Sequence, residues 1–118
     1  MMKRLLTALL VLLAMPAASQ QAFRTDGAAA TVTLNATGTT SRVQLQTAVP
    51  GAPNARLYNS GSVAVFVNCG DVTVVATTAT GMPVAPGSVE VIGCQNTHIA
   101  GITASGTATV YVTPGTGI

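Results

Sequence analysis

The side chains best suited to chemistry in this sequence are two cysteines, Cys69 and Cys94, and the single histidine, His98. Cys94 and His98 are four residues apart, and Asp71 closely follows Cys69, so a metal site is the first chemistry to weigh. A blue-copper centre uses two histidines and a cysteine, and a structural zinc site uses four cysteine or histidine ligands. One histidine is too few for the copper set, and two cysteines with one histidine are too few for zinc. The sequence therefore predicts no metal and no cofactor.

Catalysis by His98 is the second chemistry to weigh. A histidine base needs a nucleophile and an orienting group, but the chain has no Gly-x-Ser-x-Gly segment and its acids are Asp26, Asp71 and Glu90. Paired carboxylates for glycoside cleavage are compatible with three acids, yet aromatic residues, which commonly hold sugars, make up 3% of the chain. We predict that the protein is not an enzyme and that His98 is a partly exposed strand residue.

A disulfide between Cys69 and Cys94 is the chemistry that the sequence favours. An even number of cysteines in an exported chain is typical of disulfide bonding. Each cysteine comes at the end of a predicted strand, and the bond would close a loop of 25 residues. In the chain-entropy description such a bond stabilises the fold by about 3.5 kcal/mol. The alternative is two free buried thiols that pack as small apolar side chains.

Residues 1–19 have the pattern of a secretory signal peptide. Lys3 and Arg4 precede an apolar run over residues 5–15, and small residues lead to an expected cleavage between Ser19 and Gln20. The apolar run is about half of the roughly 20 residues that a membrane-spanning helix needs. We expect an exported protein, periplasmic or extracellular, with no membrane span after cleavage. An uncleaved anchor and a misassigned start codon are the alternatives.

The charge balance excludes several classes of partner. Charged residues are 7% of the chain, against about 25% in an ordinary globular protein, and the net charge of +2 falls to zero when Lys3 and Arg4 are removed. A neutral chain has no field that attracts nucleic acid. Hydrophobic residues at 48% also exclude a disordered chain. Because near-zero charge promotes association, we expect self-association or binding to a protein surface.

The chain after the leader reads as an all-β domain. Residues 20–30 are small and polar and predict a flexible N-terminal arm, whereas residues 31–118 are rich in Val and Thr, with Gly and Pro turns between short alternating runs. The spacing predicts an antiparallel β-sandwich of about eight strands, of jelly-roll or immunoglobulin-like form. The expected strands are 31–35, 42–48, 55–59, 63–68, 72–78, 88–93, 97–103 and 107–113.

Two of these windows, 63–67 and 72–76, are apolar on both faces. Such runs are typical of central strands that are covered on both sides. The candidate binding residues are Arg56, Tyr58, His98 and Tyr111, because aromatic and basic side chains are scarce elsewhere in this chain. A pocket lined by Tyr58, Tyr111 or His98 would make the protein a periplasmic or extracellular ligand-binding module, which is the alternative to a structural role.

Three stretches carry a resemblance to a known group of proteins. They are ARLYNSG at 55–61 with VAVFV at 63–67, MPVAPGSVEV at 82–91, and HIAGITASGTATVYVTPG at 98–115. In these the chain resembles small Val/Thr-rich β-sandwich proteins encoded in the structural-gene regions of tailed phages and prophages. The resemblance implies a non-enzymatic virion accessory protein, of decoration or head-surface type, with no active site. It implies a place on the virion surface if the start codon is misassigned, since such proteins usually lack a leader.

Overall fold

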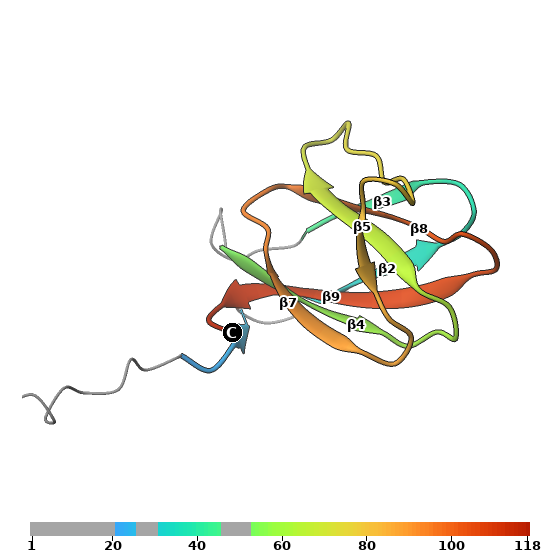
Figure 1. The fold of residues 1–118 in the computed structure, drawn as a ribbon. Coiled ribbons are helices and arrows are strands. Elements are labelled where there is room, and N and C mark those ends of the chain that lie inside the picture. The colour runs from blue at the N-terminus through green and yellow to red at the C-terminus, as the bar shows by residue number, and fades with distance from the viewer. Residues whose placement is uncertain (1–20, 26–30, 46–52) are drawn as a thin grey trace, which may run out of the picture.

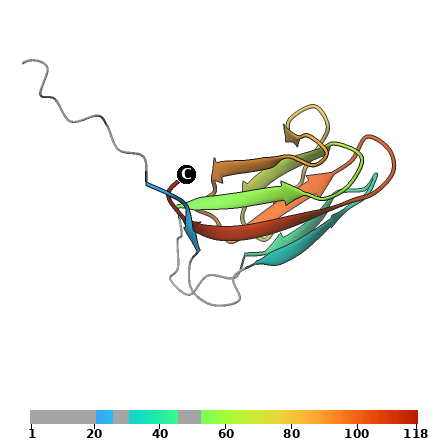
Figure 2. The same ribbon diagram turned by 90° about the horizontal axis from the view of Figure 1, so that it is seen from below.

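The computed structural model describes residues 21–25, 31–45 and 53–118. Within these ranges every regular element is a β-strand, and the strands form two antiparallel sheets that pack face to face (Figures 1 and 2). The strands are β1 (Arg24–Thr25), β2 (Val32–Ala36), β3 (Ser41–Gln44), β4 (Asn54–Asn59), β5 (Val65–Gly70), β6 (Met82–Val84), β7 (Val89–Gly93), β8 (His98–Ile102) and β9 (Ala108–Thr116). The predicted all-β sandwich is confirmed.

The strand pairing is nested, and it identifies the type of sandwich. Sheet A has the order β1-β9-β4-β7, with β2 also paired to β9, and sheet B has the order β3-β8-β5-β6. In sequence order the pairs are nested: β5·β6 is the innermost pair, and β4·β7, β3·β8 and β2·β9 enclose it in turn. The chain is thus one long antiparallel hairpin wrapped over itself into two sheets, which is the jelly-roll arrangement. Of the two forms expected, the jelly roll is the one observed.

The core between the sheets is built from small aliphatic side chains. Alternation along β4 places Ala55 and Leu57 inward and fully buried, and β9 contributes Val110 and Val112 in the same way. The sheets also approach closely where a side chain is absent. A Cβ on Gly101 would lie 2.7 Å from Leu34 Cδ2, so glycine at this position lets the side chain of Leu34 pack directly on the backbone of β8.

One polar side chain lies fully buried at the end of β4. The Asn59 side-chain amide donates to the carbonyl oxygens of Val63 and Val84, at 2.9 and 3.0 Å, and its oxygen accepts from the Gly61 backbone at 2.9 Å. Its own backbone bonds to residues 87–88. Asn59 therefore joins β4, the turn that follows it, β6 and the turn before β7, and all of its side-chain hydrogen-bonding groups are used.

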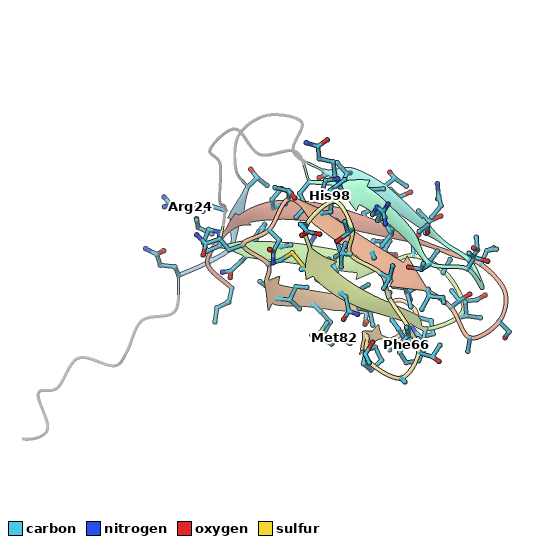
Figure 3. All side chains as sticks on the ribbon, turned by 90° about the horizontal axis from the view of Figure 1, so that it is seen from above. Arg24, Phe66, Met82 and His98 are labelled. Carbon is cyan, nitrogen blue, oxygen red and sulfur yellow. A yellow bond between two sulfur atoms is a disulfide. The ribbon has the colours of Figure 1, made fainter. Side chains whose placement is uncertain are left out.

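The disulfide joins the two sheets. Cys69 in β5 of sheet B is bonded to Cys94, which directly follows β7 of sheet A, with the two Cα atoms 5.7 Å apart. The bond is the yellow link inside the sandwich in Figure 3. Cys94 is buried and Cys69 half-buried. The predicted bond is confirmed, and it links β5 of sheet B covalently to the segment that follows β7 of sheet A.

The prediction of a strand over residues 72–78 is wrong. The chain turns immediately after β5, because the Asp71 carboxylate accepts a hydrogen bond from the Thr73 backbone at 2.8 Å and the Asp71 carbonyl accepts one from Val74 at 3.1 Å. Residues 71–81, here called the β5–β6 loop, contain turns and no strand. The short strand β6 was not predicted. The other seven predicted windows each contain a strand, and the end of the 42–48 window lies outside the described residues.

The β5–β6 loop covers the outer face of sheet B. Arg42 and Asn68 donate side-chain hydrogen bonds to two backbone carbonyls within residues 74–76, at 3.3 and 3.1 Å, and the Thr40 hydroxyl accepts one from the same segment at 2.9 Å. Ala100, which lies between Arg42 and Asn68 in the register, is fully buried beneath it. The apolar run at 72–76 is therefore a cover on the sheet rather than a member of it. The loop is the yellow projection in Figure 1.

The two ends of the described chain meet at one end of the sandwich. Within the segment predicted to be a flexible arm, Arg24 and Thr25 form β1 and pair with the end of β9. The Ile118 backbone also donates to the Gln21 carbonyl at 3.0 Å. Gly115 permits this pairing, because a Cβ there would overlap the carbonyl oxygen of Arg24.

Candidate interaction face

The outer face of sheet A presents the aromatic candidates that the sequence pointed to. Alternation along β4 turns Arg56 and Tyr58 outward, because Leu57 between them is buried in the core. Alternation along β9 turns Tyr111 outward, because Val112 faces the core. Since β4 and β9 are hydrogen-bonded neighbours in the middle of the sheet, these side chains share one surface.

Tyr58 and Tyr111 form a stacked pair at the centre of this surface. They are direct partners in the β4·β9 register, with ring centroids 6.2 Å apart and planes inclined by 16°. The two residues are 39% and 43% exposed. A cross-strand aromatic pair of this kind contributes about 0.5–1.5 kcal/mol beyond its buried area. The pair is thus held in place by its own contact while much of its surface remains open to solvent.

The neighbouring strands extend the surface on both sides of the pair. The same cross-strand row continues to Thr33 on β2 and to Val89 on β7, and Val89 is 45% exposed. Arg56 lies one row away and, within the described part of the chain, makes no hydrogen bond or ion pair. We call Arg56, Tyr58, Val89 and Tyr111 the tyrosine face.

The tyrosine face carries one charge, and that charge is positive. Glu90 is the nearest acid along β7, but its register partner is the inward-facing Leu57, so it belongs to the opposite side of sheet A. Threonine hydroxyls border the face and bond to one another or to neighbouring amides, as in the 2.7 Å contact of Thr31 with Thr113. The face is therefore apolar at its centre, polar at its border and cationic at Arg56.

His98 does not join the tyrosine face. It begins β8 in sheet B, where it pairs with Gln44 and Gly70 on the outer side of that sheet. The ring is half-buried, and Nδ1 is 2.9 Å from the Thr97 hydroxyl oxygen. A single pocket formed by both tyrosines and His98 is not present.

The charged groups near His98 are Asp71 and Arg42. The pKa of Asp71 is lowered, chiefly by the hydrogen bonds it accepts from the Thr73 hydroxyl and backbone amide, and to a smaller extent by the positive charge of His98 and Arg42. Among the residues that the structure describes, no three His, Cys, Asp or Glu side chains lie together in a way that could hold a metal ion.

Two features of the exposed surface of the protein, one on each side of the sandwich, were not predicted from the sequence. Tyr58 and Tyr111 were named as separate candidates, but their stacking depends on the β4·β9 register, which no local pattern reveals. Val72 and Val75 were predicted to lie in a buried central strand, and instead they are 59% and 53% exposed on the β5–β6 loop.

Comparisons of the chain with protein-family models, with curated proteins and with solved structures find no match. The described residues include no helix with the length and apolar character needed to cross a membrane.

Proposed function

We propose that this is a non-enzymatic exported structural protein that attaches to a surface through the tyrosine face, in the manner of a phage virion accessory subunit. The observation that carries the proposal is the open, stacked pair of Tyr58 and Tyr111 with Arg56 beside it, which has no hydrogen-bond or ion-pair partner among the described residues. Tyrosine and arginine are the residue types enriched at the energetic centres of protein interfaces, where lysine, aspartate and glutamate are depleted.

The rest of the sandwich surface is less suited to docking. The outer face of sheet B is covered by the chain's own β5–β6 loop. Three of the sheet edges also carry features that discourage strand addition: β7 has Glu90, β3 has Arg42, and β6 is three residues long and contains Pro83. At the β2 edge, the Asn35 carbonyl already accepts a hydrogen bond from the Ser41 hydroxyl. A sheet face is therefore a better attachment surface than a sheet edge.

Export is supported by the disulfide and by the leader pattern. A stable bond between Cys69 and Cys94 is typical of an oxidising compartment. Amino-terminal sequencing of the protein recovered outside the cytoplasm tests this directly. The expected first residue is Gln20, and a recovered chain that still begins at Met1 would contradict cleavage.

The virion role is tested on particles released by the strain that carries the gene, purified on a density gradient. We expect the mature chain to migrate with the particles, and particles from a gene-deletion strain to bind the purified protein again. Tyr58→Ala/Tyr111→Ala should lose this binding, whereas Met82→Ser, which changes an exposed apolar side chain outside the face, should keep it.

Absence of the chain from the particles would overturn the virion role. In that case specific signals on a glycan or peptide array, lost in the double tyrosine variant, would identify a ligand-binding module instead.

A further inference from the structure

Exposed large apolar side chains gather at two places in the described chain. One is the tyrosine face on sheet A, and the other is the first turn of the β5–β6 loop, here called the loop tip, where Val72 and Val75 are exposed. The loop lies on the outer face of sheet B, so the two patches are on opposite sides of the sandwich. Neither patch can cover the other within one molecule.

The loop tip is held in a defined shape. The Asp71 carboxylate and carbonyl fix the turn through Thr73 and Val74, and side chains of sheet B hold the following backbone at two carbonyls. Gly70 allows the loop to fold back, because a Cβ there would lie 2.8 Å from the Val74 side chain. A loop that is ordered before binding loses little conformational entropy when it docks.

The two patches also match in charge. Arg56 is the charged residue of the tyrosine face and has no partner within the described chain. Asp71 flanks the loop valines, and one of its carboxylate oxygens, Oδ1, accepts from Thr73 while no hydrogen bond to Oδ2 occurs among the described residues. The tyrosine face thus presents a cation, Arg56, beside apolar rings, and the loop tip presents a carboxylate, Asp71, beside two valines. The two patches are complementary in charge.

We propose that the tyrosine face of one molecule receives the β5–β6 loop of a second copy, with Val72 and Val75 against Tyr58 and Tyr111 and with Asp71 toward Arg56. The inference rests on the surface named in the proposed function and specifies its occupant. The contact is head-to-tail, so an open assembly of any length keeps one free face at one end and one free loop at the other. Such contacts build a ring where the rotation closes and a chain where it does not.

A symmetric face-to-face contact is disfavoured by the same charges. Two tyrosine faces packed about a twofold axis would bring two copies of Arg56 together, and the nearest acid on the described strands of sheet A, Glu90, points to the other side of the sheet. Like charges at an interface oppose association. The head-to-tail contact gives each Arg56 a carboxylate instead.

Complementation between two variants tests the arrangement. Tyr58→Ala/Tyr111→Ala removes the face and keeps the loop, whereas Val72→Ser/Val75→Ser removes the loop tip and keeps the face. Sedimentation of the oxidised mature wild-type chain should show a mass that rises with concentration. Each variant by itself should remain a monomer, and an equal mixture of the two should form dimers and nothing larger, because one competent contact remains.

Matched controls distinguish this contact from nonspecific hydrophobic association and from unfolding. Met82→Ser alters another exposed apolar side chain and should associate like the wild type. Arg56→Glu should weaken association by about tenfold or more, the effect of a charge contact near 1.4 kcal/mol. Arg24→Glu makes the same charge change outside the face and should have little effect. Thermal melting of every variant confirms that the fold is retained.

The possible failures are distinguishable. A wild-type chain that stays monomeric at every concentration overturns the head-to-tail contact, while binding to particles through the tyrosine face would leave the proposed function standing. A mixture that forms no dimer, or that forms species larger than dimers, overturns the head-to-tail geometry. Self-association with no binding to particles supports the inference and contradicts the virion role.

Discussion

Replacement of Asn59 is expected to be among the most destabilising polar-to-apolar changes in this fold. The side chain is fully buried and makes three hydrogen bonds, to the carbonyls of Val63 and Val84 and from the amide of Gly61. Asn59→Ala leaves those three backbone groups without their partner. At about 1 kcal/mol for each net hydrogen bond, the cost is about 3 kcal/mol, which is a large part of the 5–15 kcal/mol typical of a domain.

Thermal and urea unfolding of the oxidised protein measure this cost. A loss of about 3 kcal/mol should lower the melting temperature by roughly 12–24 °C in a domain of this size. Asn68→Ala is the matched control, because the Asn68 amide donates a single, exposed hydrogen bond to Val75, and we expect it to cost about 1 kcal/mol or less.

Asn59→Asp sharpens the test. It has nearly the same shape, but at neutral pH it places a carboxylate against two carbonyl oxygens, so it should be at least as destabilising as alanine. Part of the stability should return in acid as the buried charge is protonated. If Asn59→Ala unfolds within about 0.5 kcal/mol of the wild type, as ordinary surface substitutions do, the claim that this side chain joins the turns around β4 and β6 is refuted.

Three further predictions concern the covalent, steric and electrostatic parts of the fold. Reduction, or Cys69→Ala/Cys94→Ala, should cost about 3.5 kcal/mol in urea unfolding, and equal stability of the two states would contradict a role for the bond. Gly101→Ala should cost about 1–3 kcal/mol through overlap with the Leu34 side chain, whereas Gly93→Ala, with open space around it, should cost less. Because the pKa of Asp71 is lowered below 3.8 in the folded state, its contribution should be present above that pH and be lost as the pH falls through the folded pKa. Asp71→Asn should therefore be less stable than the wild type at pH 7 and equal to it in strong acid, and a difference that persists in acid would argue against the carboxylate.

Alternation along the chain predicted much of the fold, because a strand with one buried face repeats every two residues. The window that became β9 shows this most clearly, since Ala108, Val110 and Val112 form its buried face as the alternation predicts. The run at 72–76 was taken for a strand because its apolar valines resemble a buried strand, although Val72 and Val75 are exposed on the β5–β6 loop. β6 escaped detection because Pro83 argues against a strand, although an edge strand tolerates it.

The site was predictable as a set of residues but not as an arrangement. Arg56 and Tyr58 are two residues apart in a predicted strand, and such spacing puts two side chains on one face. Whether Tyr111 or His98 would join them depended on which distant strands become neighbours. That choice follows from the nested pairing of the whole chain, and it placed Tyr111 beside Tyr58 and His98 in the other sheet. The exposed valines of the loop could not be found while their segment was taken for a strand.

The bond between Cys69 and Cys94 also turns residues 69–94 into a covalent ring, and the projecting β5–β6 loop lies inside it. Exposed loops of this kind are the usual sites of proteolytic nicking. A protease that cuts this loop would open the ring without freeing either fragment, and the severed ends would stay attached through sulfur until a reductant reached them. A nicked molecule would thus keep its full mass on a non-reducing gel and divide into two bands on a reducing one.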